Sequence, residues 1–298
     1  MLGKLCGLTV LLVLLGAWAA LAQTIYGSAY PAPGGVATLY TISPTTGAAT
    51  PIGSIGFPQV GSLAFAANGT LYGVGFLGGT SVLLTINTTT GAGSLVGSTG
   101  IADFFQDIAF RSDGTLFGYA GHIPATGPSV GNIYTINTTT GAATLVGSTG
   151  KGFPFGDGLA FAAANVLYTA NQLELDSIDQ FTGTATTVIP LNYAPDFGTE
   201  IPRANGMKFD PFTGTLYAAV VSGGNQQARV RSLGTINIST GVVTRIGPTI
   251  DGLDAIAIAS QTTPPPVPAL SSFGQVLFVV LLFLGGLLFL RRRLSPAA

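Results

Sequence analysis

Short stretches in which apolar and small polar residues alternate recur along the chain, separated by turn residues. The clearest is residues 133–150, IYTINTTTGAATLVGSTG, and a near copy is residues 83–100, LLTINTTTGAGSLVGSTG. Weaker copies begin at Leu39, Leu175 and Leu233. β-Branched Thr and Ile favour a pleated, half-buried strand. The pattern therefore predicts the same pair of strands five times.

Each copy carries a turn signal at a fixed place. A short polar residue that can bond its own backbone comes first, and a glycine follows four residues later, as in Asn137 and Gly141. Glycine supplies the positive φ that closes such a turn. The copies therefore predict β-hairpins with loops of four to five residues. The turn glycines are Gly47, Gly91, Gly141, Gly183 and Gly241.

A second repeated hairpin alternates with the first. It begins at Leu63, Ile108, Leu159 and Met207, and reads LAFAANGTLYG in its first copy. Asn-Gly or Asp-Gly between alternating apolar residues is the strongest short-range hairpin signal. Two hairpins make a four-stranded unit, and the turn glycines recur at intervals of 44, 50, 42 and 58 residues. A period near ~40–50 residues is typical of propeller blades, so we predict an all-β, five-bladed β-propeller.

The fifth copy of the second hairpin is incomplete. Residues 256–260 (IAIAS) match residues 108–112 (IAFRS), but no returning strand follows before the prolines. Residues 24–27 (TIYG) match residues 70–73 (TLYG) and supply the missing strand. Pairing the N-terminal strand with the C-terminal one would close the ring and remove exposed edges. We predict that one blade is split between the two ends of the chain.

The N-terminus carries an export signal. Lys4 precedes an apolar run over residues 8–21, and Ala20-Leu21-Ala22 is a small-residue cleavage site. We predict a signal helix within residues 1–22, with cleavage between Ala22 and Gln23. The single cysteine, Cys6, lies in this segment, so the mature chain has no disulfide framework and no cysteine metal site.

The C-terminus carries a membrane stop. Residues 261–268 (QTTPPPVP) predict a proline-rich, extended spacer. Residues 273–290 contain no charged side chain, and Arg291, Arg292 and Arg293 follow at once. This length just spans the hydrocarbon core at ~1.5 Å per residue, and the arginines favour the cytoplasmic side. We predict a transmembrane helix that leaves the repeat domain, residues 23–260, outside the cytoplasm.

The residues before this helix form a further motif. Residues 267–274 read VPALSSFG and precede the apolar segment and the arginine cluster. This layout over residues 267–298 resembles the IPTL-CTERM protein-sorting domain, which is similar to the PEP-CTERM tails of exported bacterial proteins. The family pattern is Ile-Pro-Thr-Leu-Ser-Glu-Trp-Gly, and the chain departs from it at positions 267, 269, 272 and 273. It keeps Pro268, Leu270, Ser271 and Gly274. The resemblance implies sorting by an exosortase-type membrane transpeptidase, with release or transfer of the protein after tail cleavage; the alternative is a plain single-pass anchor.

Composition narrows the class of partner. The chain is 47% apolar and only 8% charged, which suits one large β domain with targeting segments. Lys4 and the three arginines lie outside residues 23–260, which leaves seven basic residues against twelve acidic ones and a net charge of about −5. No basic stripe is present, which argues against nucleic acid.

The connections between the predicted strands differ between the two sides of the ring. The short hairpin turns fall on one side, here called the turn face, and the longer connections fall on the other side, the loop face. Variable loops on a rigid scaffold usually carry binding, so the loop face is the candidate functional face. Its longer connections are residues 28–36, 121–131, 191–203 and 222–230.

Acidic residues gather on the loop face, where the first strand of a blade begins or on the longest loop. One hypothesis is a carboxylate cluster that binds a cation or supplies a general acid and base. The alternative is that each aspartate caps nearby backbone N–H groups. The candidate binding residues are Asp107, Asp157, Asp254 and Glu200, with Asp251 and Asp196 nearby.

The sequence offers few further residues or motifs for catalysis or for binding a metal or nucleotide. The single histidine, His122, has no second imidazole for a metal site, and the common hydrolase and nucleotide-binding motifs do not occur. We therefore assign no catalytic residue, cofactor or metal. Recurrent phenylalanines before the first strands predict either a stacking platform for sugar rings or packing between blades. They are Phe57, Phe104, Phe105, Phe153, Phe155 and Phe197.

Three functional hypotheses follow. The leading one is an exported propeller, tethered or sorted at the bacterial envelope, that acts as a binding or structural module toward an extracellular glycan or an envelope protein. The second is a hydrolase or lyase of an extracellular polysaccharide that uses Asp107, Asp157 and Glu200 at the propeller channel. The third is a scaffold stabilised by a bound cation.

Overall fold

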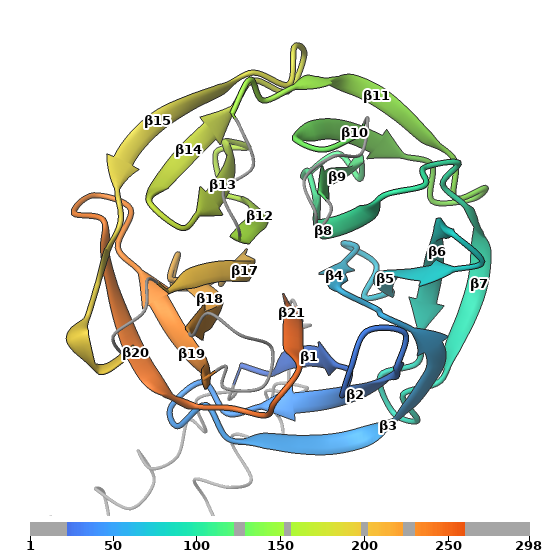
Figure 1. Cartoon of the computed structure of the whole chain (residues 1–298), viewed down its shortest axis with the longest axis horizontal. Helices are drawn as coiled ribbons and strands as arrows, with labels where there is room; N and C mark the ends of the chain where they lie inside the picture. The colour runs from blue at the N-terminus through green and yellow to red at the C-terminus, as the bar shows by residue number, and fades with distance from the viewer. Residues whose placement is uncertain (1–22, 122–128, 152–155, 198–201, 223–229, 260–298) are drawn as a thin grey trace, which may run out of the picture. The chain divides into compact units, whose positions relative to one another are not determined.

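The repeats form a ring of small sheets. The computed structural model describes residues 23–121, 129–151, 156–197, 202–222 and 230–259. Figure 1 shows five sheets around a common axis, each with one strand nearest the axis and one at the rim. A short 3-10 helix, Pro195–Phe197, is the one helical element in these ranges. The prediction of an all-β, five-bladed propeller is confirmed.

The blades are numbered here by their order along the chain, and their strands are given from the axis outward. Blade 1 consists of β21 (Leu253–Ile258), β1 (Ile25–Ala29), β2 (Val36–Ile42) and β3 (Ala49–Pro58). Blade 2 consists of β4 (Ser62–Phe65), β5 (Leu71–Leu77), β6 (Thr80–Ile86) and β7 (Gly93–Ser98). Blade 3 consists of β8 (Phe104–Phe110), β9 (Leu116–Gly121), β10 (Asn132–Ile136) and β11 (Ala143–Ser148).

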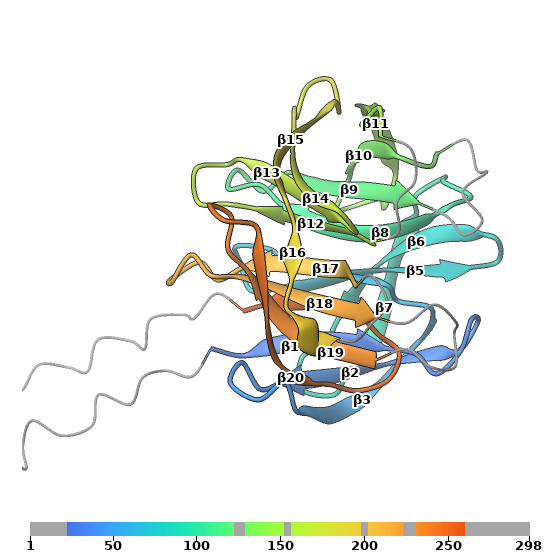
Figure 2. The same ribbon diagram turned by 60° about the vertical axis from the view of Figure 1, so that its left-hand side comes forward.

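The last two blades differ from each other at the rim. Blade 4 consists of β12 (Gly156–Phe161), β13 (Leu167–Asn171), β14 (Glu174–Ile178) and β15 (Ala185–Pro190). Blade 5 consists of β17 (Arg203–Phe209), β18 (Leu216–Ser222), β19 (Val230–Ile236) and β20 (Val242–Pro248). A fifth strand, β16 (Asn192–Tyr193), pairs parallel with β20, in the segment that descends from β15 in Figure 2.

The ring closes by pairing the two ends of the repeat domain. Strand β1 lies between β2 and β21, and Tyr26 stands opposite Thr41 on one side and Ala257 on the other. Both pairings are antiparallel, so the N-terminal strand completes the blade that the C-terminal strand begins. The predicted closure is confirmed, and it pairs β1 along both of its edges.

The repeated turns form as their side chains require. In the blade 2 turn, Asn87 Oδ1 accepts hydrogen bonds from the N–H groups of Thr89 and Thr90, both at 2.9 Å. Gly91 then adopts a φ of 81° and donates its N–H to the Asn87 carbonyl oxygen at 2.8 Å. The first residue of the turn thus satisfies the local backbone, and glycine closes the loop. Asn137, Asp179 and Asn237 make the same bonds in their copies.

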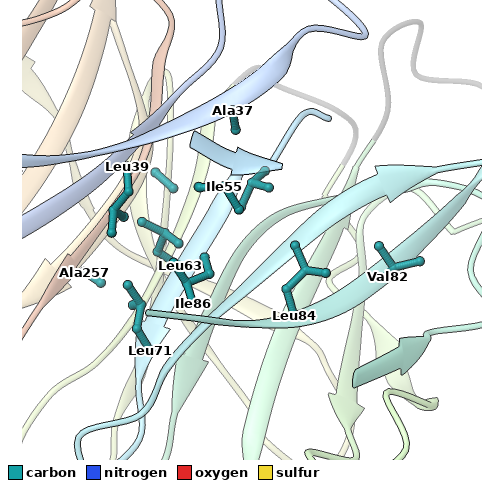
Figure 3. Packing of buried hydrophobic residues seen from close by; sticks show 11 residues of the cluster. Ala37, Leu39, Ile55, Leu63, Leu71, Val82, Leu84, Ile86 and Ala257 are labelled. Carbon is teal, nitrogen blue, oxygen red and sulfur yellow. The ribbon is translucent and has the colours of Figure 1, made fainter. Parts of the chain in front are cut away.

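The core lies between blades. Figure 3 shows one cluster in which Leu39 and Ala257 of blade 1 meet Leu63, Leu71 and Leu84 of blade 2. These side chains are fully buried or nearly so. Burial stabilises by about 25 cal/mol per Å² of apolar surface removed from water. Since each blade presents apolar residues to both neighbours, a single blade could not bury its own core.

Glycines let the rim of each blade approach the next one. Gly97 of β7 lies against the turn at Thr140 and Gly141 of blade 3, so closely that a methyl group at Gly97 would overlap the Thr140 carbonyl oxygen. The same contact joins Gly53 to Gly91, Gly147 to Gly183 and Gly247 to Gly47, and Pro190 meets Gly241 at the remaining junction. The repeated turn therefore serves as the contact between blades.

The targeting segments lie outside the described residues. This applies to the predicted signal helix and to Ala22 at the cleavage site, whereas Gln23 is the first residue described. It applies also to the spacer, to the sorting residues Pro268, Leu270, Ser271 and Gly274, and to Arg291, Arg292 and Arg293. Within the described ranges, no helix has the length and hydropathy that a membrane crossing requires. Export, anchoring and sorting stay predictions.

Candidate functional site

Asp107 lies near the ring axis, on the innermost strand of blade 3, and its side chain is fully buried. Its Oδ1 accepts the N–H of Ile108 at 2.9 Å. Its Oδ2 accepts the N–H of Leu159 at 2.8 Å and that of Met207 at 3.1 Å. The carboxylate therefore caps backbone donors on β8, β12 and β17, the innermost strands of three successive blades.

Lys208 of β17 completes this arrangement. Its ammonium donates to both oxygens of Asp107 at 2.7 Å, and to the carbonyl oxygens of Leu159 at 3.1 Å and Met207 at 2.8 Å. Burial raises the pKa of Asp107 to about 6, although Lys208 and the backbone donors oppose the rise. Burial also lowers the pKa of Lys208, against the effect of Asp107. The pair acts as an internal clamp, which supports the backbone-capping interpretation of Asp107.

Two glycines bring the innermost strands into direct backbone contact beside this clamp. A methyl group at Gly158 would lie 3.0 Å from the backbone nitrogen of Met207. One at Gly206 would lie 3.0 Å from the carbonyl oxygen of Asp254. Strands β12, β17 and β21 therefore pack through their main chains at this level of the axis, where the sequence had suggested an acid-lined channel.

Asp254 occupies a different environment on the loop face. Its Oδ2 accepts a hydrogen bond from the Tyr30 hydroxyl at 2.5 Å, and its Oδ1 accepts the side-chain amide of Asn205 at 2.6 Å. Arg231 lies 3.4 Å from Oδ1 and donates to the Leu253 carbonyl oxygen at 2.6 Å. The Asp254 side chain is 17% exposed. We call Tyr30, Asn205, Arg231 and Asp254 the axial polar cluster.

The axial polar cluster retains unused hydrogen-bonding capacity. The buried Oδ1 of Asn205 has no hydrogen-bond partner among the described residues, and the same holds for Oγ of fully buried Ser62 on β4. A methyl group at neighbouring Gly61 would stand 3.4 Å from Asp254 Oδ2, so the start of β4 borders the cluster. Unpaired buried acceptors are costly. The cluster therefore combines a partly exposed carboxylate with an amide oxygen that lacks a donor.

Most of the remaining candidates have no described side chain. Asp157 belongs to β12, but its side chain lies outside the described part of the structure, as do Glu200 and His122. Asp196 and Asp251 are exposed. Among the side chains that the structure describes, no group of three or more His, Cys, Asp or Glu could hold a metal ion. Asp107 and Asp254 have separate sets of partners.

The phenylalanines that the structure describes pack between elements. Phe104 stacks on Phe76 with ring centroids 4.1 Å apart, and buried Phe105 meets Tyr134 edge-on at 5.7 Å. Phe197 is buried against Tyr193, and Phe57 packs on the core between blades 1 and 2. These contacts favour the packing interpretation over a stacking platform; Phe153 and Phe155 lie outside the described residues.

Sequence reasoning missed two members of the axial polar cluster, Tyr30 and Arg231. Tyr30 lies in residues 28–36 and Arg231 directly follows residues 222–230, two of the longer connections chosen above as candidates for binding. Their side chains meet Asp254 only because the ring brings β1 and β19 beside β21. The lengths of these connections could have identified the region of the loop face, but not the contacts of Tyr30 and Arg231 with Asp254.

A second polar cluster on blade 4 was also missed. Lys151 donates to Glu174 at 2.6 Å and to Thr187 Oγ1 at 2.6 Å, and its ammonium lies 3.3 Å from buried Asp176. Lys151 lowers the pKa of Glu174, whereas burial raises the pKa of Asp176. The lysine lies between both acids and joins the segment after blade 3 to blade 4.

Comparison with known proteins finds matches among solved structures alone. No protein-family model and no curated protein sequence matches it. A putative 6-phosphogluconolactonase from Bacteroides fragilis aligns over 82% of this chain and 100% of its own, with 12% identity and a TM-score of 0.45. A gluconolactonase from Xanthomonas campestris covers 78% and 79%, with 14% identity and a TM-score of 0.44. The PQQ-bound aldose sugar dehydrogenase of Streptomyces coelicolor covers 71% and 76%, with 16% identity and a TM-score of 0.43.

The sheet topology makes the chain a five-bladed β-propeller. Its solved structural neighbours include sugar dehydrogenase and lactonase enzymes. At these identities and TM-scores the neighbours carry no argument about its activity.

Proposed function

We propose that the protein is an exported propeller, held at the bacterial envelope by its C-terminal tail, that binds a hydroxyl-rich ligand such as an extracellular glycan on its loop face. In this proposal it acts as a binding module and performs no reaction. The observation that carries it is the axial polar cluster around Asp254, which sits among the variable connections and presents a partly exposed carboxylate held by Tyr30 and Asn205.

The chemistry of this cluster suits sugar hydroxyls. A hydroxyl group both donates and accepts, so it could donate to the partly exposed carboxylate of Asp254 and accept from Arg231. The Asp254 carboxylate is already fixed by Tyr30 and Asn205. A ligand would therefore meet a preorganised acceptor, which reduces the entropy lost on binding.

The alternative of a polysaccharide hydrolase or lyase receives no support from Asp107. A general acid or base must reach the reacting atoms. Asp107 is fully buried, and both of its oxygens accept hydrogen bonds from Lys208 and from backbone N–H groups. We therefore favour the binding module.

The binding proposal is tested on a glycan array with the full-length protein solubilised from membranes, followed by titration of any ligand found. Asp254→Asn and Asn205→Ala should each weaken binding by about tenfold or more, since a hydrogen bond to a charged group is worth ~1.5–3 kcal/mol. Asp113→Asn is the matched control, because Asp113 is an exposed acid on the turn face. Equal affinity of all variants, or no glycan bound by the parent protein, would reject the proposal.

The tail proposal has a separate test. If an exosortase-type transpeptidase processes the tail, intact mass of the protein from its native host should show loss of residues beyond the VPALSSFG segment, and of residues 1–22 through signal cleavage. A mass that retains Arg291, Arg292 and Arg293 would show that the tail is not cleaved, and would favour a single-pass membrane anchor. Retention of Met1–Ala22 would contradict export by this signal.

A further inference from the structure

Two large aromatic side chains project from the turn face. Phe181 is 87% exposed, and Phe212 is 61% exposed. Phe181 stands where the other copies of the turn carry Thr45, Thr89, Thr139 or Ser239. Phe212 occupies the turn between β17 and β18 of the next blade. Exposed apolar groups of this size on one face mark an interaction surface more often than single scattered residues do.

Both phenylalanines are held at the tips of ordered turns. Asp179 Oδ1 accepts the N–H groups of Phe181 at 2.8 Å and Thr182 at 2.9 Å. Asp210 Oδ1 accepts the N–H of Phe212 at 2.8 Å. Beneath the two turns, Tyr168 of blade 4 contacts Phe209 of blade 5 with ring centroids 5.9 Å apart. The two tips therefore belong to adjacent, mutually packed blades and face the same side of the ring.

The described turns of this face carry four charged side chains, of which the exposed Asp179 has no cationic partner. Arg111 and Asp113 pair with each other at 2.6 Å, Asp179 caps its own turn, and Asp210 is buried. The pairing with Asp113 raises the pKa of Arg111, which keeps it charged and engaged. Val166, at the end of the β12–β13 turn of blade 4, adds a third apolar side chain that is 37% exposed. A face with apolar tips and few unpaired charges suits the interface of a lipid bilayer.

The chain also leaves the propeller on this face. Strand β21 ends at Ile258, and the N–H of Ala259 bonds the carbonyl oxygen of Thr24 at the start of the domain. Residues 260–272 separate Ala259 from the predicted transmembrane segment. In an extended conformation of ~3.1 Å per residue they reach about 40 Å. A tether of this length keeps the turn face near the bilayer, at an effective concentration on the order of mM.

We propose that the turn face rests on a lipid surface through Phe181 and Phe212. This inference rests on the proposed membrane anchor, and it leaves the loop face with the axial polar cluster directed away from the bilayer. Because the face offers no unpaired basic side chain among its described residues, the contact should not require anionic lipid and should be insensitive to salt.

The test uses tryptophan fluorescence in the full-length chain reconstituted into vesicles of zwitterionic lipid brominated on the upper acyl chain. The only native tryptophan, Trp18, lies in the segment that signal cleavage removes, and Trp18→Phe keeps any uncleaved precursor silent as well. Phe181→Trp in that background should lose about half or more of its emission on brominated vesicles compared with plain ones, since interfacial aromatics lie at the headgroup level. Adding Phe212→Thr should reduce this quenching.

Leu173→Trp is the matched control. Leu173 is 60% exposed and lies in the β13–β14 connection of the same blade, on the opposite face. It should show no quenching. Equal quenching at positions 173 and 181, or none at position 181, would overturn the proposal, as would quenching that appears only with anionic lipid.

Flotation of the vesicles separates this inference from the anchor. Protein that floats without quenching at position 181 contradicts the lipid contact alone. Protein that does not float contradicts the anchor as well.

Discussion

At the scale of single residues, the Asp107–Lys208 pair shows how a charged site can be structural. Removing two charges from water costs more than their attraction returns unless further hydrogen bonds satisfy both groups. Here three backbone N–H groups and two carbonyl oxygens supply those bonds. The pair therefore belongs to the interior, although in the sequence Asp107 resembled a site residue at the predicted start of an innermost strand.

Lys208→Met should destabilise the fold by about 3–5 kcal/mol at pH 7, because it leaves the buried carboxylate of Asp107 without its counter-ion. The double variant Asp107→Leu/Lys208→Met should recover most of this loss. Urea unfolding monitored by circular dichroism measures both. A double variant as unstable as the single one would contradict the assignment of the pair as a clamp.

The stability of the same variants should depend on pH in different ways. The pKa of Asp107 is raised from 3.8 to about 6 in the folded chain, so between about pH 6 and pH 4 the folded state binds a proton that the unfolded state does not. The contribution of Asp107 to stability therefore rises as the pH falls through this window. In Lys208→Met the rise should begin at higher pH, since the ammonium no longer favours the charged carboxylate. In the double variant it should be absent.

At the scale of elements, the repeated turn has two functions at once. It closes a hairpin by local hydrogen bonds, and its glycine receives the outer strand of the preceding blade. Glycine stands on both sides of this contact at four of the five junctions, since the two main chains approach within the space that a side chain would fill, and Pro190 takes the outer-strand position at the fifth. The Gly in the outer strands of blades 1, 2, 3 and 5 is thus explained by the neighbouring blade, while the Gly in each turn is already explained by its own φ.

Gly97→Ala should lower the free energy of unfolding by about 3 kcal/mol, because the added methyl group would overlap the Thr140 carbonyl oxygen. That oxygen belongs to the main chain, which cannot move away as a flexible side chain could. Gly100→Ala is the control. Gly100 has a φ of 77° and open space around it, so it should cost only about 1 kcal/mol of backbone strain. Thermal and urea unfolding of the two variants give the comparison. Equal losses would show that the contact between blades is unimportant.

At the scale of the whole molecule, stability depends on closing the ring. Each apolar cluster lies between two blades, and the last junction exists only when β1 joins β21. The contacts between the two ends span nearly the full domain, which makes closure late and cooperative. The folded propeller therefore requires both of its terminal strands.

Deletion of residues 25–29, which form β1, should abolish the single cooperative unfolding transition, because it opens the ring and exposes the outer edge of β21 and the inner edge of β2. Deletion of residues 261–298 should leave the transition unchanged, since β21 ends before them. Calorimetry of the two shortened chains checks this. A cooperative transition at the parent temperature in the chain without β1 would refute the closure argument.

The sequence alone determined the local structure and the order of elements. Turn chemistry and strand periodicity depend on neighbouring residues, so Asn137, Gly141 and the alternating Thr and Ile predicted the hairpins, their number and the split blade. Side-chain partners across the axis depend on how far the blades close, which no local pattern encodes. Only the tertiary structure therefore joined Asp107 to Lys208 as a buried clamp, and brought Tyr30 and Arg231 to Asp254.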